Sequence, residues 1–415
     1  MEMNEDVVIV GAGIAGLATA LALKKVGIRS LVLERSQELR TTGAALTLFP
    51  NAWRALQVLG VDHKLTSIYP SLQRGYITNI ASGATQEVYF TGSERKKFEP
   101  RAVHRKNLLE TLAEELPPGT IRFSSKLSSI ETQTFEGSSI AILHLDDGTQ
   151  IKAKVLIGCD GVHSVVARWL GLMDPVHSGR SAVRGLAVYP QGHKVKDIHQ
   201  YINNGVRGGF APLTDKEIYW FIAHNSKPTS GGMEADPRQI QQDVIENSAK
   251  DFPSEYLEVV RHAELSTLSL APLMFRFPWD LIFGKVFKGN ITVAGDAMHP
   301  MTPDLGQGGC AALEDAVVLG RHLGNLLLQH GRIAPGEVAG ALERYTKERR
   351  WRAAGLIMGS YISGWVQQLG SGWLMKFLRD TVFYGFLFSK IVDIDYDCGE
   401  LPHFPLSVGS QTKID

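Results

Sequence analysis

The sequence predicts an α/β fold, and the prediction depends on three glycine-containing turns that each follow a short apolar run. The turns are Gly11-Ala-Gly-Ile-Ala-Gly16 after Val7 to Val10, Gly158-Cys-Asp-Gly161 after Val155 to Ile157, and Gly295-Asp296 after Ile291 to Ala294. Apolar, β-branched runs bounded by turn residues are typical of buried parallel strands. A strand that ends in glycine leaves backbone amides free to approach a ligand at the carboxyl edge of the sheet. Three such ends indicate one extended ligand.

The first turn belongs to a complete dinucleotide-binding fingerprint. The segment Ile14 to Val26 has the apolar spacing of a helix, and a second strand, Ser30 to Leu33, is followed by Glu34. Glu34 lies 18 residues after Gly16, close to the spacing at which a carboxylate accepts hydrogen bonds from the adenosine ribose. Strand, glycines, helix, strand and acid together predict a Rossmann-like domain that binds an adenine cofactor, FAD or NAD.

Length and composition restrict the class of protein. At 415 residues the chain exceeds the size at which one hydrophobic core stops growing, so we expect at least two domains. Lys plus Arg and Asp plus Glu each number 43, and this balance argues against nucleic acid as a partner. The three cysteines are far apart and form no Cys/His cluster, so we expect no metal. The start, Met1 to Asp6, runs directly into the first strand without a signal peptide, and the cytoplasm is the expected compartment.

Later elements indicate two interleaved domains and a helical end. Helices are expected at Ala52 to Leu59, Val103 to Leu116, Ala311 to Gln329 and Val338 to Met358, and a meander of strands at Ile121 to Val155. Between about Ser181 and Ser269, short strands with one polar helix, Pro237 to Ala249, are typical of a separate antiparallel sheet. We therefore assign 1–69, 99–176 and 270–350 to the nucleotide-binding domain, 70–98 and 177–269 to a substrate-binding sheet domain, 351–400 to C-terminal helices and 401–415 to a tail.

Three motifs in this order resemble those of the single-component FAD-dependent aromatic hydroxylases, the family that includes para-hydroxybenzoate hydroxylase. The motifs are Gly11-x-Gly-x-x-Gly16, Gly158-Cys-Asp-Gly-Val-His-Ser164 with Arg168, and Gly295 to Gly309. The segments ending at Ala316 and Pro402 are similar to plant members related to zeaxanthin epoxidase. The resemblance spans roughly Val7 to Trp351. It implies tightly bound, non-covalent FAD, NADPH or NADH as a transient reductant, and O2 as co-substrate.

The activity implied by the resemblance is that of a hydroxylase or epoxidase. Such a monooxygenase inserts one oxygen atom from O2 into an electron-rich aromatic, heteroaromatic or alkene molecule through a flavin C4a-hydroperoxide, here in plant specialised metabolism. A plain NAD-dependent dehydrogenase would explain Gly11 to Glu34 but not the two later motifs. A halogenase would carry a Trp-x-Trp-x-Ile-Pro pattern, which we do not find. A flavin-binding protein without turnover remains an alternative, and the substrate and the oligomeric state are not predicted.

Matched position by position, the resemblance implies a cofactor site. Glu34 would hold the adenosine ribose, Asp160 would serve both FAD and the nicotinamide, and Asp296 would bond the ribityl or pyrophosphate region. Arg105 matches an arginine near the ribityl chain, with a solvent-facing helical arginine as the alternative. The expected cofactor-binding residues are Gly11, Gly13, Ala15, Gly16, Glu34, Arg35, Arg105, Asp160, Gly161, Asp296, Gly306, Gly308 and Gly309.

Substrate contacts are expected from the antiparallel sheet and from two loops. Alternation places Tyr219 and Phe221 on one side of their strand and Trp220 and His224 on the other, and one side should cover the flavin. The expected substrate-lining residues are Leu48, Tyr201, Phe210, Tyr219, Phe221 and Pro303. The candidates for catalysis are Tyr219, His224 and Arg207, each with a structural role as the alternative, and epoxidation requires no general base. Arg184 and Arg207 suit either a carboxylate substrate or a domain interface.

The segment from Tyr361 to Ile394 is unusually aromatic. It is interrupted by Lys376, Arg379 and Asp380, so no apolar span reaches transmembrane length. We expect this segment to pack on the main body, with contact to a membrane surface or a lid role as alternatives. The tail from Ser407 to Asp415 is expected to be disordered.

Overall fold

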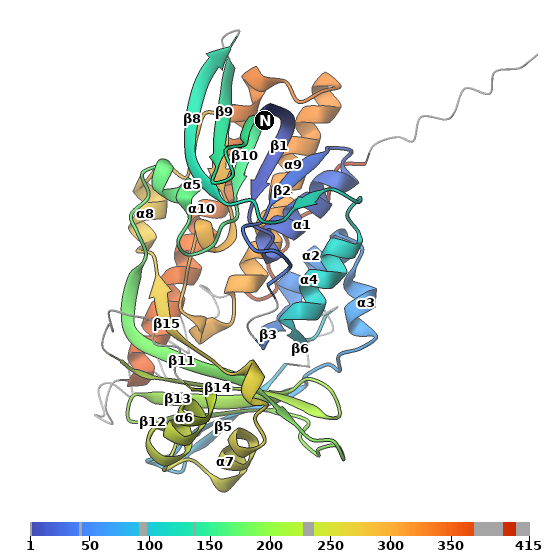
Figure 1. The fold of residues 1–415 in the computed structure, drawn as a ribbon. Coiled ribbons are helices and arrows are strands. Elements are labelled where there is room, and N and C mark those ends of the chain that lie inside the picture. Colours follow the sequence, from blue (N-terminus) through green and yellow to red (C-terminus); the bar gives the residue numbers. More distant parts are fainter. Residues whose placement is uncertain are drawn as a thin grey trace, which may run out of the picture.

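The computed structural model describes residues 2–40, 44–90, 98–135, 138–226, 236–368 and 393–403. Two large sheets organise this part of the chain, an eight-stranded sheet and a seven-stranded sheet, which lie at opposite ends of the molecule (Figure 1). A two-stranded sheet of β3 (Ala45–Leu48) and β6 (Arg101–His104) lies between them. The expected α/β class, with a parallel sheet and a separate antiparallel one, is confirmed.

The eight-stranded sheet has a parallel centre. Its main path, from one edge to the other, is β16 (Phe287–Lys288), β17 (Ile291–Val293), β10 (Gln150–Gly158), β1 (Glu2–Val10), β2 (Ser30–Leu33) and β7 (Ile121–Arg122). A hairpin of β8 (Leu127–Phe135) and β9 (Ser138–Leu145) pairs with the amino-terminal half of β10. Register places Val10 beside Gly158, and Gly158 beside Val293. The three glycine turns therefore lie next to one another at one edge of the sheet.

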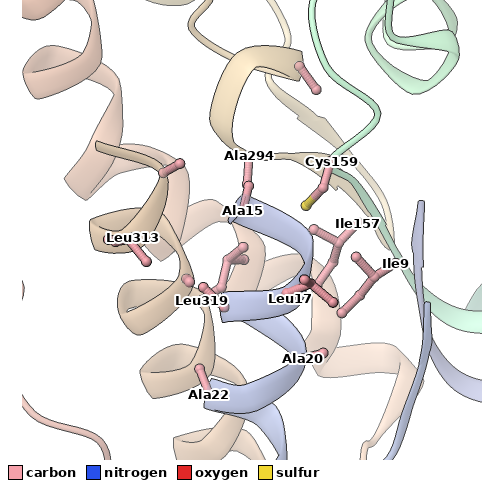
Figure 2. Packing of buried hydrophobic residues seen from close by; sticks show 14 of the residues in the cluster. Ile9, Ala15, Leu17, Ala20, Ala22, Ile157, Cys159, Ala294, Leu313 and Leu319 are labelled. Atoms are coloured by element: carbon pink, nitrogen blue, oxygen red, sulfur yellow. The ribbon is translucent and has the colours of Figure 1, made fainter. Parts of the chain in front are cut away.

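Helix α1 (Ile14–Lys25) covers this sheet, and α9 (Gly308–His330) packs on the other side of α1. Figure 2 shows Leu17 of α1 directed toward Ile9 and Ile157 of the sheet, with Leu313 and Leu319 of α9 on the other side. These side chains are almost fully buried. Both faces of α1 are thus covered, which explains why it is apolar nearly all round. The shorter helices are α2 (Pro50–Val58), α3 (Asp62–Thr66), α4 (Arg105–Glu114), α5 (Val165–Trp169) and α8 (Pro278–Phe283).

The seven-stranded sheet is antiparallel except for one parallel pair, β12 with β4. Its order is β15 (Ser269–Phe275), β11 (Val176–Val188), β14 (Glu217–Asn225), β13 (Val206–Pro212), β12 (Ile198–Asn203), β4 (Arg74–Asn79) and β5 (Thr85–Tyr89). The helices α6 (Pro237–Asp243) and α7 (Ser254–Arg261) cover one side and enclose a second apolar core around Trp220 (Figure 1). The long helix α10 (Pro335–Gln368) runs beside both sheets.

Several elements differ from the sequence-based expectation. Val103 belongs to strand β6, where it pairs with Leu46, so the helix expected from Val103 begins only at Arg105. Pairing with a distant strand overrides local helical spacing here. The polar helix continues past Asp243 as a π-helical turn, Val244–Ser248. Strand β15 pairs with the seven-stranded sheet, so the boundary assigned at 270 falls at its beginning. Helix α10 passes through the boundary assigned at 350 without a break.

Two expectations for the C-terminus lie largely outside the described residues. Most of the aromatic segment and the tail from Ser407 fall there. Residues 393–403 run along the nucleotide-binding part, where Ile394 O accepts a hydrogen bond from Asn51 N at 2.9 Å. Within the described ranges, no helix is long and apolar enough to cross a membrane, and no three His, Cys, Asp or Glu side chains are placed to hold a metal ion.

Candidate cofactor and substrate site

A cavity of about 390 Å³ lies where β1, β10 and β17 end. Eleven of the thirteen expected cofactor-binding residues line it: Gly11, Gly13, Ala15, Glu34, Arg35, Arg105, Asp160, Gly161, Asp296, Gly308 and Gly309. Gly16 does not line the cavity but packs against the turn itself, where a Cβ would lie 1.9 Å from Gly11 O. Gly306 adopts a left-handed conformation after a 3-10 turn and is outside the lining. The cavity is long, since it extends from Glu34 on one side to Arg184 of the seven-stranded sheet on the other.

Glycine is present for different structural reasons at two positions of the first turn. Gly11 has φ +103°, and a Cβ there would lie 2.4 Å from Cys159 O, so the fold itself requires glycine. Gly13 has φ −83° and ψ −172°, which other residues adopt, and a Cβ there would meet nothing within 4 Å. The fold therefore leaves the space beside Gly13 open toward the cavity.

Two helices begin at this cavity with no side-chain cap. The residue preceding α1 is Gly13 and the residue preceding α9 is Gln307, and neither caps its helix. Neither helix has an acidic residue in its first turn. The free amides and the positive ends of two helix dipoles therefore face the cavity and favour a negatively charged ligand. Five basic side chains against three acidic ones add to this preference; the basic ones are Arg35, Arg40, Arg105, Lys126 and Arg184.

Glu34 is fixed by the backbone of two turns. Its Oε2 accepts a hydrogen bond from Ala12 N at 2.9 Å, and its Oε1 accepts one from Ser36 N at 2.9 Å. The residue is only 4% exposed, yet it lines the cavity. Because each carboxylate oxygen has two lone pairs, Glu34 can still accept hydrogen bonds from a pair of ribose hydroxyls.

The two aspartates of the later turns have different environments. Asp160 accepts hydrogen bonds from Ser164 Oγ at 2.5 Å and Val165 N at 2.7 Å, and it thereby fixes the start of α5. Burial raises the pKa of Asp160, although these hydrogen bonds act in the opposite direction. Asp296 faces the cavity, and within the described part of the chain its carboxylate accepts no hydrogen bond. Although its side chain is open to the cavity, desolvation by the surrounding protein raises its pKa, opposed by His299 and Arg105.

A buried charge network supports the Gly295 turn from behind. Asp315 of α9 accepts hydrogen bonds from Gly295 N at 2.9 Å and Arg349 Nε at 2.7 Å, and its Oδ2 lies 2.6 Å from His299 Nε2. Burial alone would raise the pKa of Asp315, but His299 and Arg349 outweigh it and lower the pKa to about 2. Burial would lower the pKa of His299, but Asp315 outweighs it and raises the pKa. Arg349 also pairs with Glu314 at 2.6 Å.

The expected substrate residues separate into two groups. Tyr219 and Phe221 share a side of the sheet with Arg184 and Arg207, and Tyr219 packs against the core of the nucleotide-binding part. Leu48 is fully buried in that core, and Pro303 is exposed at the start of a 3-10 turn. None of these four residues lines the cofactor cavity.

Three expected residues lie on the opposite side of the sheet, which corrects the prediction. Tyr201 and Phe210 are buried beneath α6 and α7 in the second core, and the alternation of β14 places His224 on that side as well. Alternation in the sequence shows which residues share a side, but not which side the helices cover. The third catalytic candidate, Arg207, donates a hydrogen bond to Asp304 O at 3.0 Å and so joins the two parts of the molecule.

Some residues that line the cavity were not predicted from the sequence. Arg40 and Lys126 were not expected because they belong to loops without a motif. Lys126 is brought to the cavity by a long-range hydrogen bond of its neighbour, Ser125 N to Glu34 O, whereas Arg40 follows Glu34 by six residues. The buried pair of Arg349 with Asp315 was also missed. The run of charges from Lys347 to Arg352 offered a signal, because a buried helix position rarely carries an unpaired arginine.

Comparison with known proteins gives a consistent result. The family described as FAD binding domain matches residues 4–360. Monooxygenase 2 of Arabidopsis thaliana is 41% identical over 411 residues, covering 96% of this chain and 99% of that protein. Monooxygenase 1 of the same plant is 37% identical, covering 95% and 99%. The structure of Klebsiella pneumoniae HpxO complexed with FAD and uric acid aligns with a TM-score of 0.77 at 23% identity, covering 95% of this chain and 96% of that chain, which shows a shared fold.

Proposed function

The chain belongs to the FAD-binding-domain family and to its flavin monooxygenases, and from this premise we propose that it oxygenates a small molecule. The reaction inserts one oxygen atom from O2 into an electron-rich aromatic, heteroaromatic or alkene substrate, with NADPH or NADH as the reductant. The observation that carries the proposal is the single cavity that runs from Glu34 and two uncapped helices to the inner side of the seven-stranded sheet. The role proposed for the reaction is in plant specialised metabolism; the two Arabidopsis relatives, whose names say only that they are monooxygenases, support the plant setting alone.

The lining residues fit FAD along its length. Glu34 suits the adenosine ribose, and the amides at the start of α1, next to the open space at Gly13, suit the pyrophosphate. Asp296, whose carboxylate accepts no hydrogen bond from the residues that the structure describes, would suit the ribityl hydroxyls. Bound FAD supplies electron transfer from the nicotinamide and activation of O2.

The protein's own groups set the conditions for this chemistry. The uncapped start of α9 at Gly308 would favour negative charge on a reduced flavin bound in the cavity. Tyr219 and Phe221, whose ring centroids are 6.2 Å apart, lie on the same side of the sheet as Arg184, although only Arg184 of the three lines the cavity. Burial raises the pKa of Tyr219, so at neutral pH it donates a hydrogen bond rather than acting as a base.

The first test is the absorption spectrum of the purified protein, followed by NADPH oxidation in the presence of single ligands. The ligands are phenolic acids, heteroaromatics, indoles and cyclic alkenes, and the products are examined for oxygen derived from ¹⁸O2. A yellow protein whose NADPH oxidation rises with one class and whose product contains ¹⁸O supports the proposal. Hydrogen peroxide without product for every class, or a flavin that neither NADPH nor NADH reduces, contradicts it and favours a flavin-binding protein without turnover.

A further inference from the structure

The described C-terminal residues 393–403 form a strap, a segment without helix or strand that crosses three helices. At its beginning, Ile394 O accepts a hydrogen bond from Asn51 N of α2 at 2.9 Å, and Asp393 O accepts one from Arg352 Nη2 of α10 at 2.7 Å. The strap includes a stretch that resembles plant relatives, yet none of its residues lines the cofactor cavity. Its role is therefore not that of a direct ligand contact.

The strap is closely packed on α9, the third helix. Its Cys398 is 1% exposed, and Leu401 and Pro402 lie against two glycines of that helix. A Cβ at Gly320 would lie 3.0 Å from Leu401 Cδ2, and a Cβ at Gly324 would lie 2.8 Å from Pro402 Cγ. The absence of side chains at these two positions lets the strap approach α9 closely.

Tyr396, in the middle of the strap, covers two arginines of α10. The guanidinium carbon of Arg352 lies 4.7 Å from the centroid of the Tyr396 ring, and that of Arg349 lies 5.3 Å from it. Both distances are within the range of a cation–π contact. Burial raises the pKa of Tyr396, although Arg349 acts in the opposite direction, so the ring stays uncharged at neutral pH. One half-buried ring thus holds two cations in place.

The same two arginines bind carboxylates in the second turn of α9. Arg349 Nη2 lies 2.6 Å from Glu314 Oε2, and Arg349 Nε donates a hydrogen bond to Asp315 Oδ1 at 2.7 Å. Arg352 Nη2 donates to Glu314 Oε1 at 2.9 Å. Burial would raise the pKa of Glu314, but the two arginines outweigh it and lower the pKa. Glu314 and Asp315 are fully buried, so separating either from its arginine is costly.

Asn51 connects the strap to the start of α9 by a second route. Its backbone N–H binds the strap, and its Nδ2 donates to Gln307 Oε1 at 2.9 Å and to Glu314 Oε1 at 2.6 Å. Asn51 and Gln307 are almost fully buried. Gln307 directly precedes Gly308, which lines the cavity at the start of α9. The strap therefore reaches the cavity through residues that do not line it.

We propose that the strap holds the start of α9 in place beside the bound flavin, and that Tyr396 is a positioning residue for this purpose. The amides at the start of α9 favour negative charge, so a fixed helix start favours the reduced flavin more than the oxidised one. Tyr396 acts through Arg349 and Arg352 and touches no residue of the turn at Gly308 directly. The inference concerns the FAD site alone and does not depend on the substrate or on turnover.

The test is the reduction potential of FAD in the yellow holoprotein, together with an FAD titration of the apoprotein and a thermal melt. The variants are Tyr396→Leu, which removes the ring, Tyr396→Phe, which keeps it, and Asn51→Ala, which removes the second route. The matched control is Tyr189→Leu. Tyr189 is also half-buried, and its ring stacks on His262 at 4.4 Å beside the second core of the seven-stranded sheet.

We expect Tyr396→Leu to weaken reduced FAD about threefold to tenfold more than oxidised FAD, as the loss of a helix-end interaction implies. The potential then becomes more negative by about 15–30 mV, since a factor of ten is about 30 mV for a two-electron couple. Asn51→Ala should shift the potential in the same direction. Tyr396→Phe should keep the ratio of the two affinities within about twofold of the wild type. Tyr189→Leu should lower the melting temperature and leave the potential unchanged.

Three results would overturn the inference. A lowered melting temperature with the wild-type potential in both Tyr396→Leu and Asn51→Ala would show that the strap only stabilises the fold. An equal shift of the potential in Tyr189→Leu would show that the potential follows general stability. A shift in Tyr396→Phe as large as in Tyr396→Leu would contradict a role of the ring over the arginines. Because the measurement needs bound FAD but no substrate, its outcome is distinct from a failure of the proposed oxygenation.

Discussion

Replacing Gly13 with alanine separates the folding of the first turn from its role in binding. The backbone at Gly13, with φ −83° and ψ −172°, accommodates alanine, and a Cβ there meets nothing within 4 Å. The folded apoprotein should therefore tolerate the change. Since alanine restricts the unfolded chain, the substitution should even stabilise the apoprotein by about 0.4–1 kcal/mol.

The same methyl group should interfere with FAD. The open space beside Gly13 is the cavity, and the amides at the start of α1 line it. A hydrogen bond to a charged group contributes about 1.5–3 kcal/mol, so the loss of one or two amide contacts to the pyrophosphate costs about 3 kcal/mol. This is a factor of about 100 in the dissociation constant.

The assay is a titration of apoprotein with FAD, read by the quenching of flavin fluorescence, together with a thermal melt of the apoprotein. Gly355→Ala is the matched control, because Gly355 of α10 also has no atom within 4 Å of its Cβ position and lies outside the cavity lining. It should leave the FAD affinity unchanged. If Gly13→Ala binds FAD within about threefold of the wild type, the pyrophosphate does not approach the turn at Gly13.

Three further substitutions test the carboxylates. Asp315→Asn leaves the buried His299 without its anion and leaves Arg349 with Glu314 alone, which should cost about 3–5 kcal/mol in a denaturant titration. Because the pKa of Asp315 is lowered to about 2, its contribution to stability is present above about pH 4 and is lost as the pH falls toward 2. The melting temperature of the variant should not show the part of the acid-induced decrease that Asp315 causes in the wild type. Asp296→Asn should raise the melting temperature of the apoprotein, since a raised pKa means that the charged form is disfavoured at neutral pH, and should weaken FAD binding about tenfold in the same titration. Asp304→Asn should lower the melting temperature by several degrees and increase the fraction of NADPH oxidation that ends in hydrogen peroxide, measured with a peroxide assay, because its two arginines lose their shared anion.

Local sequence signals predicted most of the residues that line the cavity near Glu34 and the glycine turns. Val7 to Val10, the glycines and Glu34 belong to one continuous segment, so their mutual placement follows from helix and strand geometry alone. The two later turns are far away in the sequence, but both end parallel strands, and parallel strands bring their carboxyl ends to one edge.

The substrate end was predicted less well, because it depends on which side of a sheet is covered. Tyr201 and Tyr219 both belong to strands of alternating character, and the sequence does not tell that α6 and α7 cover the first and leave the second facing inward. The sequence is equally uninformative about the two arginines of β11. Arg180 and Arg184 look equivalent along β11, and only the position of Asp304, 124 residues after Arg180, pairs Arg180 with a carboxylate, while Arg184 lines the cavity.

The segment from Gly295 to Asp315 connects the two ends of the site. Behind it, Asp315 binds the amide of Gly295 and the side chain of Arg349, and in front of it Asp304 binds the arginines of the seven-stranded sheet. The start of α9 lies between these two anchors in the chain, so the amides at Gly308 are held relative to both the dinucleotide turns and the inner side of the sheet. A chain of buried charge pairs permits little adjustment, because each partner loses more by separation than by holding its position. Asp304 and Asp315, which do not line the cavity themselves, therefore fix the start of α9 relative to the inner side of the seven-stranded sheet.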